Sequence, residues 1–501
     1  MQKQFSEEII KSPYSCAERS VWFVLTLLSV FGGLAVLTVS YLRTLYPYQL
    51  EECETVVWEL VNRVVIGEPI YVKPSVEFVP TLYPPVYMYL GAVLIDFFGA
   101  SYFPLRLLSV LAMCGSSFLI ICDVWLRTKR WAFGIIAAGL FLVSFQRSGF
   151  FMGLARVDSL WVFFLLLSFY LLRQISSRTG FGLFLVAYLL ALLTKQTTLF
   201  FLPGFVVALF RSELSGRWTR IALFLGVQAG CLSVVQVATG GWFYFYCFII
   251  PGGHPLFMER FDEFLGNAAC PTVLVLILTL PLLLNYYNLN VLRRVLNPLP
   301  LFAISALLAA IVGNLKIGGS WNHFIPLFAF NGICSGVLIA RWSEHLSEYR
   351  NSSKLVAWLR IVPAALILGQ FGCFWHDPRG ALAQQGNLES QRQLEVLIGA
   401  APRPILCVAP YYFLLLKNGE SPTHMNPTAL QDIRLAGIES VWRPLQKDLD
   451  NLIDSGRFGT LVLFDDQYQS MSANLRLQYN FVTNIVVHGS QTPSVYVLLK
   501  R

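Results

Sequence analysis

The hydrophobic positions of this chain gather into long apolar runs, and short polar connections separate them. Many runs reach the roughly 17–25 residues that a helix needs to cross a bilayer, so they predict membrane-spanning helices. The pattern predicts eleven spans, at residues 21–40, 104–126, 131–147, 158–173, 180–194, 197–211, 219–239, 269–290, 297–313, 323–340 and 355–375.

One further apolar segment, residues 84–99, is predicted to lie at the membrane surface or to re-enter it. It is short, it begins with Pro84 and Pro85, and it carries Asp96 in its second half. An ionised carboxylate deep in lipid is costly. Counting this segment as a span would also place every later basic cluster on the opposite side of the membrane.

A second surface helix is predicted at residues 55–66, within the same first loop, 46–99. Its apolar residues recur at helical spacing while charged and polar residues lie off the stripe, which is typical of a helix on a membrane surface. The stripe consists of Val57, Leu60, Val61 and Val64. A later aromatic and glycine-rich loop, 240–268, is predicted to form an interfacial hairpin.

Composition supports a polytopic α-helical membrane protein. The chain is 55% hydrophobic and 13% charged, with a mean hydropathy of +0.59, whereas soluble domains carry about 25% charged residues. The net charge of +8 arises mostly in short loops, which fits the preference of basic residues for cytoplasmic loops better than nucleic-acid binding. The basic clusters are Arg127/Lys129/Arg130, Arg173/Arg178, Arg211/Arg217/Arg220, Arg293/Arg294 and Arg341/Arg350/Lys354.

The segment after residue 375 is more polar and has no run of spanning length. Short β-rich pieces alternate there with helical patterns, which predicts a small α/β domain. The strands are expected at 404–409, 459–464, 481–488 and 494–499, and the helices near 388–399, 427–437 and 446–456. With eleven spans and cytoplasmic basic loops, the chain divides into a membrane domain, 1–375, and an extracytoplasmic domain, 376–501.

Charged residues on the outer side all fall near the ends of spans, at the depth of the lipid headgroups. Arg106 begins a span and has the position of a simple membrane anchor. The others are Glu51 and Glu52 after the first span, Arg156 and Asp158 at the entrance of 158–173, Lys195 between two spans, and Lys316 and His323 in a late outer loop. The ten cysteines show no CxxC spacing, so no metal framework is evident.

Carboxylates and cations at this depth suit the displacement of a phosphate from a membrane-anchored carrier. The attacking hydroxyl needs a base to take its proton. The departing phosphate needs fixed positive charge, which acts more strongly where water is partly excluded. The sequence therefore predicts a shallow site at the outer boundary of the bilayer.

The stretches around these residues resemble glycosyltransferases of the GT-C type, similar to protein O-mannosyltransferases and lipid A aminoarabinose transferases. The resemblance rests on the order and spacing of YQLEECETVVWEL, YPPVYMYLGAVLIDFFG, ARVDSLWVFFLLLSFYLL, LTKQTTLFFLP and NHFIPLFAF. It implies a fold with an interfacial segment after the first loop. It also implies transfer of a sugar from a polyprenyl or dolichyl phosphate, with inversion, on the outer face of the membrane.

The resemblance also implies roles for individual residues. Glu51 holds the place of the family's catalytic acid, usually Asp followed by Glu, and is the first choice for the base, while Glu52 orients a partner or the acceptor. Asp158 matches a second family acid, and Lys195 a family lysine. Substrate-binding residues are expected to be Tyr83, Arg156, Lys195, Lys316 and His323.

Simpler interpretations of these residues stay open. Asp158 begins a helix and suits an N-cap, with Arg156 as an ion-pair partner. Lys195 can extend to the interface without binding anything, and Tyr83 can serve only to start the surface helix.

The expected partners are a polyprenyl-phosphate-linked sugar donor, a glycan, lipid or protein acceptor, and membrane lipids, with no nucleic acid. No cofactor is required by the sequence, although a divalent metal is left open. The plasma, or inner, membrane is the expected location. The alternative functions are a transporter or flippase, or a ligase of wall polymers. Charges kept at span ends and the lack of a repeat disfavour a transporter.

Overall fold

A computed structural model gives the structure of the chain and describes most of its residues. The described residues are 16–212, 216–269, 298–347, 354–383, 385–407, 413–417, 420, 427–469, 471, 473–485 and 495–501.

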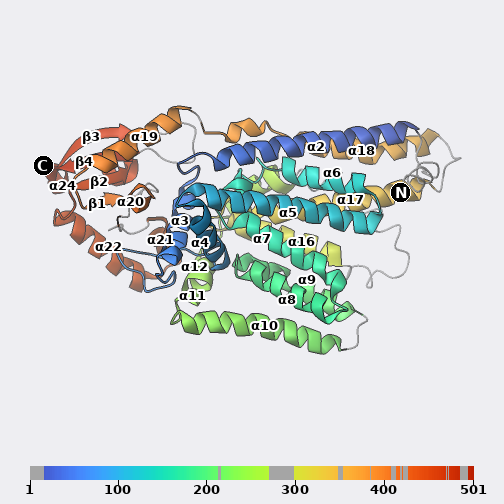
Figure 1. Ribbon diagram of the computed structural model, residues 1–501, viewed down its shortest axis with the longest axis horizontal. Coiled ribbons are helices and arrows are strands. Elements are labelled where there is room, and N and C mark those ends of the chain that lie inside the picture. Colours follow the sequence, from blue (N-terminus) through green and yellow to red (C-terminus); the bar gives the residue numbers. More distant parts are fainter. Residues whose placement is uncertain are drawn as a thin grey trace.

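Long apolar helices run alongside one another and form a bundle (Figure 1). They are α2 (Cys16–Thr44), α5 (Tyr102–Thr128), α6 (Trp131–Val143), α7 (Asp158–Leu171), α8 (Arg178–Leu192), α9 (Leu202–Arg211), α10 (Arg217–Ala238), α16 (Pro298–Leu315), α17 (Ile325–Ser347) and α18 (Lys354–Phe374). Each corresponds to a predicted span. The predicted span 269–290 falls outside the described residues, except for residue 269, so the count of eleven stays a prediction.

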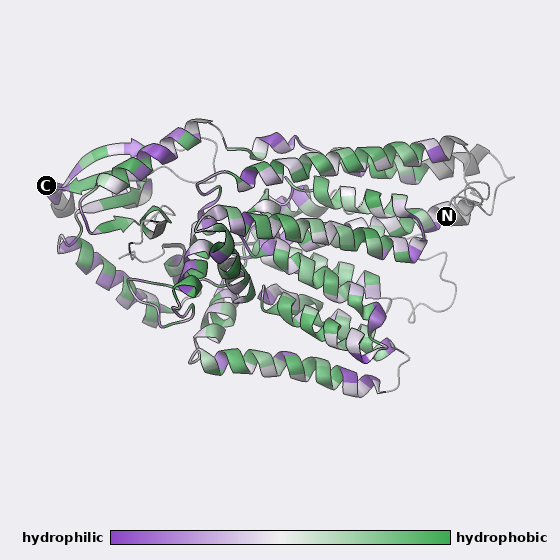
Figure 2. Cartoon of the chain, in the orientation of Figure 1, coloured by the Kyte–Doolittle hydropathy of each residue, from purple (hydrophilic) through white to green (hydrophobic). Residues whose placement is uncertain are grey.

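Five of the described helical segments are long and apolar enough to cross a bilayer, at Arg19–Thr44, Tyr102–Thr128, Arg217–Ala238, Pro298–Leu315 and Trp321–Ser343. The first described helix, α2, runs along the bundle, and the C-terminal sheet lies beyond one end of it (Figure 1). Apolar residues dominate the helices between the two ends (Figure 2). This is the distribution that a lipid environment requires.

The first loop forms two helices, α3 (Glu52–Val65) and α4 (Val86–Phe98), at the end of the bundle nearer the sheet (Figure 1). Thirteen residues of α-helix extend about 20 Å, which is short of the roughly 30 Å hydrocarbon core. Tyr89, Val93 and Phe97 on α4 are exposed. The short length of the helix and its exposed apolar side chains suit the membrane interface, where this segment was predicted to lie.

The helix α3 is more deeply buried than a helix lying on a membrane surface would be. Val57, Leu60 and Val61 of the predicted stripe are buried. Trp58, on the side that would face outward, is also buried and packs edge-on against Phe413 of α20 (Phe413–Lys417), with ring centroids 4.9 Å apart. The prediction of a helix was correct, but the helix is covered by α4 and, over Trp58, by the C-terminal segment of the chain.

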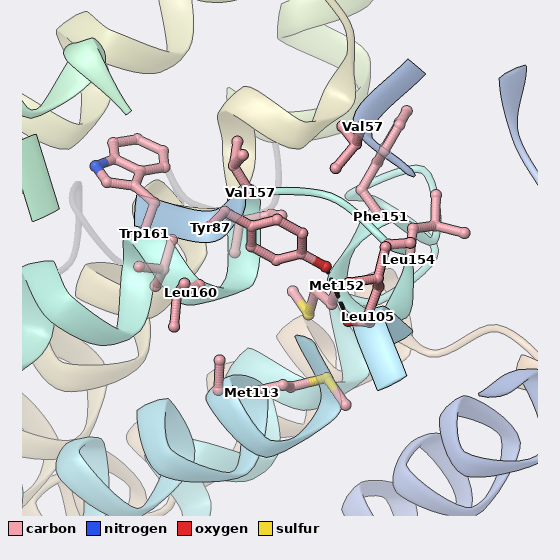
Figure 3. Close-up of a cluster of buried hydrophobic side chains, with 14 of the residues drawn as sticks. Val57, Tyr87, Leu105, Met113, Phe151, Met152, Leu154, Val157, Leu160 and Trp161 are labelled. Carbon is pink, nitrogen blue, oxygen red and sulfur yellow. Dashed lines mark hydrogen bonds between the residues drawn. The ribbon is translucent and has the colours of Figure 1, made fainter. Parts of the chain in front are cut away.

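A hydrophobic cluster joins α3, α4, α5, the turn η1 (Phe151–Gly153) and α7 (Figure 3). Figure 3 shows Tyr87 of α4 in this cluster, where its hydroxyl donates a hydrogen bond to the carbonyl oxygen of Leu105 at 2.8 Å. Satisfying this hydroxyl allows the large tyrosine ring to be fully buried. The cluster fixes the first loop against the segment that leads into α7.

The sequence predicted that Arg106 is a membrane anchor, and this prediction is wrong because the side chain is fully buried. Its guanidinium makes a two-pronged ion pair with Glu54, with Nε–Oε1 and Nη2–Oε2 distances of 2.8 and 2.6 Å. It also donates to the backbone carbonyl oxygens of Tyr46 and Tyr48, both at 2.6 Å. The planar fork of arginine matches these acceptors, so Arg106 holds the end of α2 and the start of α3 to α5.

The C-terminal segment contains a four-stranded sheet in the order β1-β2-β4-β3. The strand β1 (Ile405–Cys407) is parallel to β2 (Thr460–Phe464), and β4 (Val495–Lys500) is antiparallel to both β2 and β3 (Tyr479–Ile485). The accompanying helices are η8 (Pro378–Ala381), α19 (Gln385–Ala400), α21 (Pro427–Leu435), α22 (Glu439–Asp454), α23 (Asp465–Gln469) and α24 (Ala473–Gln478). All four predicted strands and all three predicted helices are present in the described residues.

The loop before residue 270 is a series of short helices and not the predicted hairpin. It comprises α11 (Trp242–Tyr244), η4 (Phe245–Ile249), α12 (Ile250–Gly253), η5 (Met258–Arg260), α13 (Phe261–Phe264) and η6 (Leu265–Ala269). His254 follows α12, and its Nε2 lies 3.0 Å from the backbone carbonyl oxygen of Asp432 in α21. This loop therefore contacts the C-terminal segment directly.

We expect Glu54→Gln to destabilise the protein by about 3–5 kcal/mol, because it leaves the buried Arg106 charge without its counter-ion. The measurement is the thermal unfolding midpoint of the detergent-purified protein. Glu77→Gln, which alters an exposed carboxylate of the same loop, is the control and should change stability by less than about 0.5 kcal/mol. Equal midpoints for the two variants would contradict the role of the pair.

Candidate active site

Glu51 lies in the turn between α2 and α3 and forms the N-cap of α3. Its backbone is extended, and its carboxylate Oε2 accepts a hydrogen bond from the backbone N–H of Cys53 at 3.1 Å. A carboxylate at this position satisfies an unpaired N–H and favours the positive end of the helix dipole. The side chain is mostly buried, so a local capping motif fixes one acid of the predicted pair.

Arg156 lies in the segment between η1 and α7 and joins three parts of the site. Its Nη1 donates to Glu51 Oε2 at 2.8 Å, its Nη2 to the Tyr83 hydroxyl at 2.7 Å, and its Nε to Asp158 Oδ2 at 3.3 Å. The side chain is buried. All three guanidinium nitrogens are therefore engaged by protein groups.

Asp158 is the first residue of α7 and is fully buried. Its Oδ1 accepts from Lys195 Nζ at 2.6 Å and from Asn322 Nδ2 at 2.9 Å, while its Oδ2 faces Arg156. The residue at the N-cap is Val157, and no side chain caps the helix. The capping interpretation of Asp158 is therefore wrong, whereas its pairing with Arg156 is present.

Lys195 lies between α8 and the turn η3 (Gln196–Phe201) and points at Asp158. Its ammonium also lies 5.0 Å from the centre of the Trp161 ring, at a distance that permits a cation–π contact. Burial lowers the pKa of Lys195, while the negative charge of Asp158 acts in the opposite direction. A lysine that merely reached for the interface would be exposed, so the structure excludes that interpretation.

The segment around Lys195 also holds the first loop in place. The Gln196 side chain donates to the carbonyl oxygen of Leu82 at 3.1 Å, and the Val86 N–H donates to the carbonyl oxygen of Leu193 at 2.9 Å. Tyr83 lies between these two attachments. This explains how the Tyr83 hydroxyl comes to face Arg156.

Glu52 is the first residue of α3 and is partly exposed. Within the described residues, no hydrogen bond or ion pair engages its carboxylate. Burial and the neighbouring charge of Glu51 raise its pKa, and Arg156 opposes this. Glu52 therefore differs from Glu51 in having a carboxylate that protein donors do not occupy.

Asn322 and His323 bring a fourth chain segment to the site, in the turn η7 (Trp321–Phe324) before α17. The Asn322 amide donates to Asp158, while its Oδ1 and the Nδ1 of His323 are buried and have no hydrogen-bond partner among the residues that the structure describes. The charges of Lys195 and Asp158 both act on the His323 ring.

Lys316 stands apart from the contacts described so far. Its Nζ donates to the carbonyl oxygen of Pro251 at 2.6 Å, and its own carbonyl oxygen accepts from Arg260 at 3.1 Å. It therefore fastens the short helices of residues 241–269 to the segment after α16. The ammonium is close enough for its charge to act on His323, so it borders the site.

The metal that the sequence left open has one candidate position among the described residues. Ligand atoms of Glu51, Glu52 and Cys53 lie within 4.8 Å of one another. However, the Arg156 guanidinium already occupies Glu51 Oε2 at 2.8 Å, and it places a positive charge where a cation would bind. The group fits a metal poorly.

Asn322, Gln196 and the Glu54–Arg106 pair were not assigned a role by sequence reasoning. Asn322 precedes His323, which was predicted to bind substrate, but an asparagine next to a histidine does not by itself indicate a functional role. Glu54 and Arg106 are 52 positions apart, and no local pattern indicates such a pair. The signal available for Arg106 was a charge inside an apolar run, which is costly unless it is paired.

Comparison with known proteins supports the fold. No family model and no curated protein matches the chain. Among solved structures it is similar to ArnT from Cupriavidus metallidurans bound to undecaprenyl phosphate, at 14% identity and a TM-score of 0.59, and to the same protein in the apo state, at 16% and 0.57. Each alignment covers 93% of this chain and 97% of that chain. The chain is thus an integral membrane protein with the fold of lipid A aminoarabinose transferases, the GT-C fold that its sequence predicted.

Proposed function

We propose that this protein is a membrane glycosyltransferase that moves a sugar from a polyprenyl-phosphate donor to an acceptor, with inversion at the anomeric carbon. The observation that supports this most strongly is the buried charged network, in which Glu51 of the acid pair after α2 meets Arg156, Asp158 and Lys195. The network lies on a fold that a neighbour shares, and that neighbour was solved with undecaprenyl phosphate bound.

The residues suit a single in-line displacement. An acceptor hydroxyl attacks the anomeric carbon, a carboxylate after α2 takes the hydroxyl proton, and the carbon–oxygen bond to phosphate breaks with its electron pair on the phosphate. One displacement inverts the anomeric centre. Positive charge fixed in a water-poor site stabilises the phosphate that departs.

Lys195 is the best-placed cation for that phosphate. An ammonium has three N–H donors, and the described contacts use one of them, toward Asp158. Each of the three nitrogens of Arg156 already donates to a protein group, so this guanidinium also orients Glu51 and Tyr83. Asp158 has both oxygens occupied and acts by holding Lys195, Arg156 and Asn322 in position.

The orientation of the protein follows from its charges. The acid pair and the C-terminal sheet belong to one end of the bundle, and basic residues occur in the connections α5–α6, α7–α8 and α9–α10. Basic loops favour the cytoplasm. We therefore assign the site and the C-terminal segment to the extracytoplasmic face of the plasma membrane, where a glycan, lipid or protein would serve as acceptor.

The direct test measures sugar transfer by the purified protein in lipid nanodiscs. Undecaprenyl phosphates carrying different hexoses and pentoses are each mixed with extracted envelope glycans, lipids and proteins, and the release of undecaprenyl phosphate is followed by mass spectrometry. We expect one donor to be consumed with transfer of its sugar to an acceptor. Consumption of none, together with movement of the intact lipid between leaflets, would favour the flippase alternative.

Lys316→Met is expected to weaken binding of undecaprenyl phosphate roughly tenfold, since a cation bordering the site contributes about 1.4 kcal/mol to binding a phosphate. Binding to the protein in nanodiscs is measured with the labelled lipid. Lys73→Met, at an exposed lysine of the first loop, is the matched control and should bind as the original protein does. Unchanged binding by Lys316→Met would remove this residue from the site.

Asp158→Asn is expected to make binding of undecaprenyl phosphate more sensitive to alkaline pH. Burial lowers the pKa of Lys195, and Asp158 counteracts that effect, so removing the carboxylate lowers the pKa further. Lys195 then loses its proton, and the phosphate its counter-ion, at a lower pH than in the original protein. Affinities measured across neutral to alkaline pH should show this shift, and superimposable pH profiles would argue against contact between Lys195 and phosphate.

A further inference from the structure

The proposed reaction needs one carboxylate to accept a proton, and two adjacent acids are available. Glu51 occupies the family's position for the base, but its structural setting is that of an ion-pair partner. Its Oε2 receives both the Arg156 guanidinium at 2.8 Å and the Cys53 N–H at 3.1 Å. Proton uptake by Glu51 would therefore break a buried ion pair, which is costly.

The other half of that ion pair would also be left in an unfavourable state. Arg156 is buried and would keep only Tyr83 and the longer 3.3 Å contact with Asp158. Asp158 is itself shared with Lys195 and Asn322. Neutralising Glu51 would thus disturb every charged member of the network in the middle of the reaction.

Glu52 has the opposite properties. It is partly exposed, and no donor among the described residues occupies its carboxylate. A carboxylate oxygen of Glu52 lies within 4.8 Å of both the Glu51 carboxylate and the Cys53 thiol, so it faces the same space as the network. An acceptor hydroxyl that approaches this space can reach Glu52 without displacing a protein group.

We propose, resting on the glycosyltransferase function above, that Glu52 is the general base and that Glu51 is a positioning residue locked by Arg156. The acceptor O–H proton moves to a Glu52 carboxylate oxygen while the acceptor oxygen bonds to the anomeric carbon. The bond from that carbon to the phosphate oxygen breaks, and its electron pair stays on the phosphate. Glu52 later returns its proton to solvent.

The electrostatic surroundings of Glu52 agree with this assignment. The charged and titratable groups that face it are Glu51 and Cys53 on its own turn and Arg156 from the segment before α7. Burial and the Glu51 charge raise the pKa of Glu52, and Arg156 limits the rise. A general base works best when its pKa lies near the working pH, which a raised carboxylate approaches.

The deciding experiment compares Glu52→Gln with Glu51→Gln in the donor-consumption assay over a range of pH. In the original protein, kcat/KM should rise with pH through the pKa of Glu52 and then level off, because only the ionised base is active. Glu52→Gln should lower kcat by about 10²–10⁴-fold and abolish this rise. Glu51→Gln should keep the rise of kcat/KM with pH but shift it to lower pH, because removing the negative charge of Glu51 lowers the pKa of Glu52.

A second readout does not require turnover. Infrared titration of the carboxyl C=O band should show a group that titrates above the ordinary range of glutamate in the original protein. This titration should be absent in Glu52→Gln and shifted to lower pH in Glu51→Gln. Glu77→Gln, at an exposed carboxylate of the same loop, should match the original protein in both measurements. Thermal unfolding midpoints confirm that each variant is folded.

The outcomes separate the two levels of the proposal. Suppose that the original protein transfers sugar, and that Glu51→Gln abolishes the rise of kcat/KM with pH while Glu52→Gln does not. Glu51 is then the base, so the assignment of Glu52 is overturned while the proposed function stands. If Glu52→Gln retains its activity and pH dependence, the assignment is likewise overturned. If the original protein consumes no donor of the panel, the proposed function fails and the assignment fails with it.

Discussion

The structure of this site depends on one constraint: a charge removed from water must meet an opposite charge or hydrogen-bond partners. Arg156, Asp158 and Lys195 are buried and satisfy one another. Their positions lie on separate segments, so the pairing requires the start of α7 and the α8–η3 connection to meet. Glu51 extends the same requirement to the end of α2. The charges therefore determine the geometry of the loops as much as the loops position the charges.

A second buried ion pair, between Glu54 and Arg106, lies next to this network and helps to position it. Glu54 accepts from Arg106 and from the backbone N–H of Ala155 at 2.7 Å, immediately before Arg156. Tyr102 lies beneath the Arg106 guanidinium, 4.9 Å from ring centre to charge, and its ring packs against Phe413 from the C-terminal segment. Contacts thus lead from the C-terminal, sheet-containing segment to the acids after α2.

The sequence predicted the parts of this molecule that periodicity controls. Ten apolar helices, the short α4 and the C-terminal strands follow from runs of apolar residues, because burial in lipid or in a sheet acts on each segment separately. The partners of Arg106 and the involvement of Asn322 could not be predicted, because each depends on contacts between segments far apart in the chain. The capping of α3 by Glu51 and not of α7 by Asp158 shows the same limit. Glu51 occupies the N-cap position of α3, whereas the N-cap position of α7 is occupied by Val157 and Asp158 is the first residue of that helix.

The central claim is that residues from four chain segments form one site for the phosphate of a lipid-linked donor. A cryo-electron microscopy structure of the protein with undecaprenyl phosphate tests it most directly. We expect the phosphate to lie within hydrogen-bonding distance of the Lys195 ammonium, on the side of the network that Glu52 faces. A phosphate bound elsewhere in the bundle, with the contacts among Glu51, Arg156, Asp158 and Lys195 unchanged and inaccessible, would contradict it.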